Sequence, residues 1–341
     1  MTDQSTPPVE EQARVERAAV ETSPARRGAL TRIGEIRNLG LLGVLVVLGI
    51  IGWVSQPDTF PTRNNLVTIL TQASVIGVIT VGMTFVIIGG GIDLSVGSLM
   101  GLASVWATTV ATQDMGTGGV VMVALLVGLS FGLINGLLIA YGNLVPFIAT
   151  LAMMATAVGL AQKISNKQTQ ILKSTAVNGL ATNKILGLPL LVWLFALVAL
   201  VGWVVLNRTT YGRRTFALGG NPEAARLAGV NTRLHTVSLY LLSGLCAGIA
   251  AIMIAGQTTS GSSTNGQGYE LNAIAAVIIG GTLLAGGAGT LVGSVLGVLV
   301  FTTISNLLIQ NNLQTEVQNI VTGMIIVLAV LLQRRSKETR S

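Results

Sequence analysis

Acidic side chains are scarce in the apolar part of this chain, and their positions give the first indication of where chemistry takes place. Between residues 39 and 333 they are Asp58, Asp93, Asp114, Glu223, Glu270 and Glu316. Asp58, Asp114 and Glu316 lie in short polar connections, where contact with solvent explains them. The other three lie beside glycines or helix-capping residues, which makes them the candidates for function.

Asp93 lies in the glycine-rich stretch 89–98, between two long apolar runs. A carboxylate near the hydrocarbon core of a membrane is costly and usually faces a cavity or a partner. Glycines on both sides would let a helix unwind and expose backbone groups to a pathway. Alternatively, Asp93 caps the next helix at the membrane edge, and both interpretations can hold together. Glu270 is open to the same two interpretations, with capping favoured.

Glu223 lies in a polar stretch of about thirty residues, 207–235, that separates two apolar segments. Asn221 can cap a helix, Pro222 suits its first position, and an acid such as Glu223 favours its first turn. Gly229 can end that helix in a left-handed conformation. A simple connector needs only a few polar residues. We therefore predict a short, capped helix that docks a cytoplasmic partner.

The chain lacks the residues of common catalytic and metal sites. No Gly-Lys pair occurs, so the chain has no phosphate-binding loop of the Gly-x-x-x-x-Gly-Lys-Ser/Thr type. A single His235 supports neither a zinc site nor a catalytic triad, and a single Cys246 excludes a disulfide framework. We expect Cys246 to be a packing residue. We also expect no enzymatic activity, and no metal or cofactor held by this chain.

Composition defines the elements that must position these residues. Of the 341 residues, 51% are hydrophobic, only 10% are charged and 42 are glycine, and the mean hydropathy is +0.72. Soluble domains carry about 25% charged residues, so a soluble enzyme and a disordered chain are both excluded. The net charge of +7 lies mainly in the flanks of apolar segments, without interleaved aromatic residues, which argues against a nucleic-acid partner. We predict an all-α, polytopic transmembrane helical bundle embedded in a lipid bilayer.

Ten apolar segments are predicted, most of them close to the ~20 residues that cross a bilayer. They are 39–55, 67–88, 94–112, 118–141, 145–162, 188–206, 236–256, 271–285, 287–309 and 318–333. The segment 271–285 is shorter and is bounded by glycine pairs, which indicates a discontinuous helix or half-helix.

Basic residues predict the orientation of these segments. The chain divides into a disordered tail (1–38), a transmembrane domain (39–333) and a basic C-terminal tail (334–341). The first tail carries six Arg, the stretch 207–235 carries five, and the last tail carries four Lys or Arg. The positive-inside rule places all three in the cytoplasm. Six segments precede 207–235 and four follow it, and an even number of crossings returns the chain to the same side of the membrane. The loop 163–187, with four Lys and no acid, then lies outside, against the same rule.

Glycines recur at four-residue spacing, which puts small residues on one helix face and lets backbones approach closely. The sets are Gly97/Gly101, Gly128/Gly132/Gly136, Gly244/Gly248 and Gly289/Gly293/Gly297. In addition, residues 90–101 and 286–297 match at six of twelve aligned positions. Internal repeats are common in transporters, and chance is an equal explanation for so short a glycine-rich match.

Five motifs, taken in order, resemble the permease subunits of bacterial ATP-binding-cassette importers for ribose, xylose, arabinose, galactose and inositol. They are Gly-Gly-Ile-Asp-Leu-Ser-Val-Gly-Ser at 90–98, Asn-Gly at 135–136, Pro-Phe-Ile-Ala-Thr-Leu at 146–151, Thr-Tyr-Gly-Arg at 210–213 continued by Gly-Gly-Asn-Pro-Glu-Ala-Ala-Arg-Leu-Ala-Gly at 219–229, and Tyr-Glu-Leu-Asn-Ala-Ile-Ala-Ala-Val-Ile-Ile-Gly-Gly at 269–281. The resemblance runs from about residue 55 to 333. It departs from the family in the long tail 1–38 and in the form of 164–187.

The resemblance implies a multi-pass permease of the bacterial plasma (inner) membrane that carries a sugar or polyol inward. Its implied partners are two ATP-binding subunits, a second permease copy or close relative, and an extracytoplasmic sugar-binding protein. ATP would be bound by the partner subunits and not by this chain. A stand-alone, ion-coupled secondary transporter and a membrane scaffold are the rival interpretations, and neither explains all five motifs.

The resemblance also implies roles for individual residues. The substrate path would include Asp93, Ser95, Asn135, Phe147, Thr150, Glu270 and Asn272. Coupling to the ATPase would run through the helix at 222–229 and its flanks, with Gly220, Asn221, Pro222, Glu223, Ala224, Ala225, Arg226 and Gly229.

Overall fold

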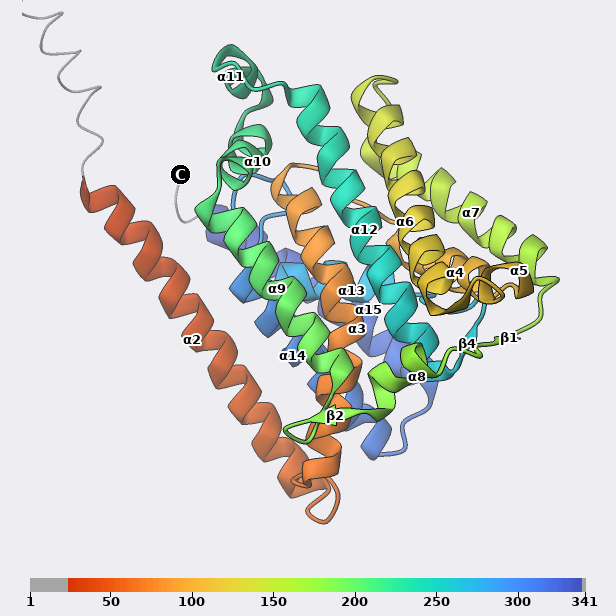
Figure 1. Ribbon diagram of the computed structural model, residues 1–341. Helices are drawn as coiled ribbons and strands as arrows, with labels where there is room; N and C mark the ends of the chain where they lie inside the picture. The colour runs from red at the N-terminus through yellow and green to blue at the C-terminus, as the bar shows by residue number, and fades with distance from the viewer. Residues whose placement is uncertain (1–23, 339–341) are drawn as a thin grey trace, which may run out of the picture.

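The computed structural model describes residues 24–338 and forms a helical bundle (Figure 1). The helices are α2 (Pro24–Ser55), α3 (Arg63–Ile88), α4 (Val96–Ala107), α5 (Val110–Gln113), α6 (Gly116–Ala140), α7 (Pro146–Ser165), α8 (Thr175–Thr182), α9 (Leu190–Arg208), α10 (Thr210–Gly220), α11 (Pro222–Leu227), α12 (Thr232–Thr258), α13 (Tyr269–Ile279), α14 (Leu291–Gln310) and α15 (Thr315–Glu338). Four two-residue strands are also present: β1 (Gln170–Ile171), β2 (Lys184–Ile185), β3 (Leu188–Pro189) and β4 (Ser260–Gly261).

Seven helices in the described range are long and apolar enough to cross a membrane. These are α3, α6, α7, α9, α12, α14 and the part of α2 from residue 38. Two further apolar helices are too short, because the 12 residues of α4 and the 11 of α13 span only about 16–18 Å. The half-helix expected at 271–285 is thus present as α13, and α15 covers the tenth expected segment.

Two expectations about element boundaries were wrong. The apolar run 94–112 does not form one span, because α4 ends at Ala107 and the backbone of Thr109 is extended. Thr109 then caps the separate helix α5. The tail 1–38 is also not disordered throughout, since α2 begins at Pro24. Residues 1–23 of that tail lie outside the described residues.

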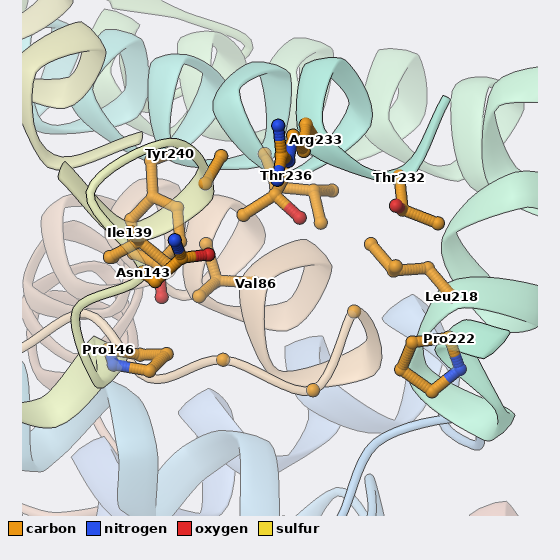
Figure 2. Close-up of a pocket in the computed structure, with 15 residues that line it drawn as sticks. Val86, Ile139, Asn143, Pro146, Leu218, Pro222, Thr232, Arg233, Thr236 and Tyr240 are labelled. Carbon is orange, nitrogen blue, oxygen red and sulfur yellow. The ribbon is translucent and has the colours of Figure 1, made fainter. Parts of the chain in front are cut away.

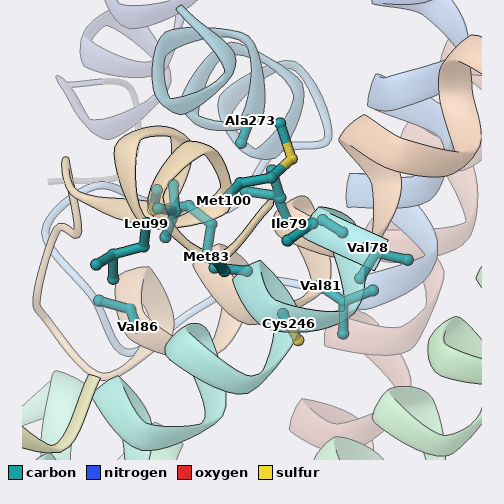
Figure 3. Close-up of a cluster of buried hydrophobic side chains, with 14 of the residues drawn as sticks. Val78, Ile79, Val81, Met83, Val86, Leu99, Met100, Cys246 and Ala273 are labelled. Atoms are coloured by element: carbon teal, nitrogen blue, oxygen red, sulfur yellow. The ribbon is translucent and has the colours of Figure 1, made fainter. Parts of the chain in front are cut away.

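Helix α3 is the central helix of the bundle, and every residue from 73 to 88 in it is buried. Figure 3 shows Ile79 and Met83 of α3 packed with Met100 of α4 and Ala273 of α13 in one hydrophobic cluster. Cys246 of α12 belongs to the same cluster and is a buried free thiol. Its surroundings agree with the packing role expected from sequence.

Close contact between α6 and α12 confirms the purpose of the spaced glycines. A Cβ atom added at Gly128 would overlap the carbonyl oxygen of Gly244, and one at Gly132 would lie 2.5 Å from the carbonyl oxygen of Tyr240. A Cβ at Gly136 would lie 2.7 Å from the Cα of Val237. The two backbones therefore touch along three turns, which only glycine permits.

The bundle has two different ends. Helices α10 and α11 lie at one end, and α8 with the short strands lies at the opposite end (Figure 1). Strand β1 pairs antiparallel with β4, and β2 pairs antiparallel with β3. The loop 163–187 and the stretch 207–235 are thus on opposite sides, as the predicted topology requires.

Candidate functional site

Asp93 lies in the irregular segment between α3 and α4, fully buried and fully hydrogen bonded. The Oδ1 atom accepts hydrogen bonds from the Ser95 hydroxyl at 2.6 Å and the Ser95 amide at 3.0 Å. The Oδ2 atom accepts one from the hydroxyl of Ser243 on α12 at 2.8 Å. Hydroxyl and amide donors thus replace the water that a carboxylate loses on burial. Asp93 does not cap the first turn of α4; it binds the amide of the N-cap residue itself.

The hydrogen bonds continue from Asp93 to α6. The side-chain amide of Asn135 donates to the Ser95 hydroxyl at 2.9 Å, while its own Oδ1 has no hydrogen-bond partner within the described part of the chain. Asp93, Ser95, Asn135 and Ser243 therefore form one buried network, which we call the Asp93 cluster. It ties the start of α4 to both α6 and α12.

The backbone of the same segment is held by two further side chains. The carbonyl oxygen of Ile92 accepts a hydrogen bond from the hydroxyl of Tyr240 on α12 at 3.3 Å, and that of Thr150 on α7 lies 3.5 Å away. Four of the seven residues expected to line the path, Asp93, Ser95, Asn135 and Thr150, are thus gathered around one segment. All four are fully buried.

The other three expected path residues lie elsewhere. Glu270 accepts a hydrogen bond from the amide of Gly268, the N-cap residue of α13, and its carboxylate lies against Gly97 of α4. Asn272 is half-buried on α13, and Phe147 on α7 is 51% exposed. Glu270 is therefore a neighbour of the Asp93 segment, whereas Phe147 and Asn272 do not contribute to the Asp93 cluster.

Sequence reasoning missed Ser243 and Tyr240, which supply two of the contacts described above. A serine in the run Tyr-Leu-Leu-Ser-Gly resembles any other small residue on a glycine-rich helix face. Its importance depends on the crossing of α12 with α4, which the sequence does not reveal.

A cavity of about 340 Å³ lies next to the Asp93 segment, on the side of α11. Its walls come from the loop 89–91, the α6–α7 connection, the start of α12 and the α10–α11 connection. Figure 2 shows Asn143 and Pro146 on one side, Leu218 and Pro222 on the other, and Thr236 between them. The cavity therefore joins the Asp93 segment to the coupling stretch.

Helix α11 has the capped form that the sequence predicts. The Oδ1 atom of Asn221 accepts a hydrogen bond from the amide of Ala224 at 3.0 Å, and Pro222 occupies the first helical position. At the other end Gly229 has a φ of 82°, and the amide of Val230 reaches back to the carbonyl oxygen of Ala225. This is a Schellman end, so α11 is fixed in shape by its own residues.

The surface of α11 is almost wholly exposed. Among the residues expected to couple to the ATPase, Ala225 alone faces inward, at 4% exposure. Arg226 binds the carboxylate of Glu223 at 2.6 Å on the open surface. This hydrogen bond and the positive charge lower the pKa of Glu223, which keeps it ionised. Leu227, 78% exposed, adds an apolar contact point beside the ion pair.

The chain matches the family model described as the permease component of the branched-chain amino acid transport system over residues 65–330. It is 37% identical over 315 residues to the ribose import permease protein RbsC of Escherichia coli K12, covering 91% of this chain and 98% of that protein. The chain belongs to this permease family. The permease is also 36% identical to RbsC of Bacillus subtilis, over 89% of this chain and 94% of that protein. It is 38% identical to the galactose/methyl galactoside import permease protein MglC of Escherichia coli K12, over 85% and 91%. No solved structure matches the permease.

These matches confirm the resemblance drawn from the five motifs. The permease is a multi-pass protein of the bacterial inner membrane, and its relatives are transport subunits and not enzymes.

Proposed function

We propose that this permease is the membrane-spanning subunit of an ATP-binding-cassette importer that moves a monosaccharide or a related polyol inward. The observation that carries the proposal is α11, a preformed and capped helix whose side chains, apart from Ala225, are open to a partner. Such a helix suits a subunit that receives mechanical work from outside the membrane. The names of the relatives supply the cargo class.

The partners follow from this role. Two ATP-binding subunits would each receive an α11 helix, one from this chain and one from a second permease copy or a close relative. The residues that face them are Gly220, Asn221, Pro222, Glu223, Ala224, Arg226 and Gly229, all of them outside the bundle core. ATP is then bound by those subunits, and a sugar-binding protein delivers cargo at the opposite end, where α8 and β1–β4 lie.

An uncharged cargo agrees with the interior of the permease better than an amino acid does. Among the described residues, Asp93 is the only carboxylate that is buried, and no Lys or Arg is buried. The two oxygens of Asp93 are already occupied by serine and amide donors. A free amino acid carries two charges that its path must stabilise, with charged side chains or with helix ends, whereas a sugar needs only hydroxyl and amide partners.

The Asp93 segment forms the closed barrier of the path in this account. The polar side chains of the Asp93 cluster are buried and bind one another, which supports a path that is shut between the extracytoplasmic end and the 340 Å³ cavity. The cavity would be the cytoplasmic mouth, because it is bounded by the α10–α11 connection. Glu270, beside Gly97, and the more open Asn272 and Phe147 would lie along the flanks of the same route.

Reconstituted uptake tests the proposal. The permease would be purified with candidate ATP-binding subunits and placed in vesicles, with sugar-binding protein and labelled ribose, galactose or inositol outside. We expect uptake that requires internal ATP and persists when ionophores collapse the ion gradients. Glu223→Arg, which places two like charges side by side on α11, should abolish that uptake while the exposed loop variant Asp58→Ala keeps it. ATP-independent uptake that ionophores abolish would instead identify a secondary transporter.

A further inference from the structure

Two helix ends and one loop, far apart in sequence, meet at one point beneath α11. They are the end of α3 at residues 88–90, the end of α10 at 219–220, and the connection between α13 and α14 at 286–287. A direct hydrogen bond joins two of them, since the amide of Gly287 donates to the carbonyl oxygen of Ile88 at 2.8 Å. We call this contact the glycine junction.

The third segment fits against the other two without space for any side chain. A Cβ atom added at Gly219 would overlap the carbonyl oxygen of Ile88 and lie 2.6 Å from the amide nitrogen of Gly287. A Cβ added at Gly287 would lie 2.7 Å from the Cα of Gly220. The end of α10 therefore packs between the end of α3 and the α13–α14 connection through direct backbone contacts.

Three glycines of the junction are required by their backbone conformation, and two of them, Gly286 and Gly287, by space as well. Gly90, Gly286 and Gly287 have φ angles of 86°, 84° and 74°, a region that residues with side chains rarely adopt. A Cβ at Gly286 would also lie 2.8 Å from the Cα of Gly90. Close-packed contacts have low compressibility and transmit strain, so a displacement of one of these backbones toward another pushes that neighbour as well.

Each segment of the junction leads directly to a part of the transport site. Gly220 is followed by Asn221, the cap of α11. Gly90 lies three residues before Asp93, and Gly287 lies a few residues before the first turn of α14. A displacement of α11 therefore reaches the Asp93 segment before α4 and the start of α14 through one shared contact.

We propose that Gly219 and Gly287 are positioning residues for transport, through which α11 moves the Asp93 segment and the start of α14 together. The inference rests on the proposed function, because it takes α11 as the ATPase-docking helix. The junction explains why position 219, near the end of α10, is occupied by glycine. It also assigns the α13–α14 connection a role that its lack of charged side chains does not suggest.

The test compares ATP hydrolysis with sugar uptake in the reconstituted complex. In Gly219→Ala the added methyl group separates α10 from Ile88, while the exposed surface of α11 that docks the ATPase is unchanged. We expect ATP hydrolysis to continue and the sugar taken up per ATP to fall by about 5- to 150-fold, the range of typical coupling free energies. Gly159→Ala, on the exposed face of α7 with open space around it, is the control and should keep the wild-type ratio.

The outcomes separate this inference from the proposed function. If the wild-type complex shows no ATP-dependent uptake, the proposed function fails. If the wild type transports and Gly219→Ala keeps the wild-type ratio, or loses hydrolysis and uptake in equal proportion, the junction does not transmit the movement and the inference is overturned.

A second measurement needs no variant and covers the case in which Gly219→Ala does not fold. Hydrogen exchange would be followed in the wild-type complex with and without a non-hydrolysable ATP analogue. We expect the amide of Gly287 and the segments 87–95 and 283–290 to change their exchange rates together with 215–222. A change confined to 215–231 would contradict the proposal.

Discussion

The two loops before α4 and α14 share aligned glycines and differ at a position between them. Gly90 and Gly286 occupy aligned positions of the twelve-residue match and have φ angles of 86° and 84°. Gly97 and Gly293 are aligned as well, and each abuts the backbone of another segment. The first loop, however, carries Asp93 where the second carries Gly289.

This difference, together with Ser95 where the second stretch has Leu291, accompanies a difference in how each loop is held. The first loop is fixed by side chains, through the Asp93 cluster and the hydroxyl of Tyr240. The second loop is held by backbone hydrogen bonds, from the amide of Gly287 to Ile88 and from that of Leu283 to Ala288, and by the side chain of Thr290, which accepts a hydrogen bond from the amide of Gly293. Two loops with similar backbone turns are therefore fixed differently. Buried polar side chains hold the first loop, and we call this set of contacts the latch; backbone hydrogen bonds are the main support of the second loop.

Removing the latch should have the largest effect on stability. Asp93→Ala leaves the Ser95 amide and the hydroxyls of Ser95 and Ser243 buried without an acceptor, and each such group costs about 1–3 kcal/mol. We expect a marked fall in the unfolding temperature of the purified permease. The exposed acid variant Asp58→Ala should unfold like the wild type. An Asp93→Ala protein as stable as the wild type would show that the cluster is not a latch.

Filling the aligned glycines tests the shared part of the two loops. In Gly97→Ala the methyl group would meet the carbonyl oxygen of Gly266, and in Gly293→Ala it would meet that of Gly280. We expect each to cost about 1–3 kcal/mol, as overpacking does in other cores, with similar values for both. If one substitution leaves the free energy of unfolding unchanged and the other lowers it, the two loops do not share the same close packing. Gly159→Ala again serves as the tolerated control.

Removing a single hydroxyl group beside each loop should give a smaller difference in the free energy of unfolding. Ser243→Ala removes a hydrogen bond to a carboxylate, which is worth about 1.5–3 kcal/mol. Ser294→Ala removes the hydrogen bond that Thr84 donates to it at 2.9 Å, between two neutral groups, which is worth about 0.5–1.5 kcal/mol. Thermal or denaturant unfolding of the two variants in the same detergent would measure the difference. Equal losses would mean that the charge of Asp93 adds nothing.

Much of the fold could be predicted because apolar length and capping residues are local signals. The long spans, the half-helix α13 and the ends of α11 at Asn221 and Gly229 all followed from them. Hydropathy does not detect the break after α4, since the break comes from the extended backbone of Thr109, whose side chain caps α5. Helix α2 also extends to Pro24 through residues whose polarity indicates a disordered tail.

The site was predicted only in part, because its contacts join segments far apart in the chain. Asp93 could be recognised, since a carboxylate among glycines in an apolar region is unusual. Its partner Ser243 lies 150 residues away and has no feature of its own in the sequence. The glycine junction is hidden for the same reason, because each glycine pair alone resembles an ordinary turn.

The proposed mechanism makes the Asp93 segment a barrier that opens during transport. Labelling of a cysteine at Thr150, which is fully buried and contacts Ile92, tests this most directly. The variant Thr150→Cys would be made with Cys246→Ala, and the equally buried Ala276→Cys near the second loop would be the control. We expect a water-soluble thiol reagent to label Thr150→Cys only when ATP and sugar drive turnover, and never to label Ala276→Cys. Labelling of Thr150→Cys at the same rate without ATP, or no labelling during measured uptake, would contradict the account.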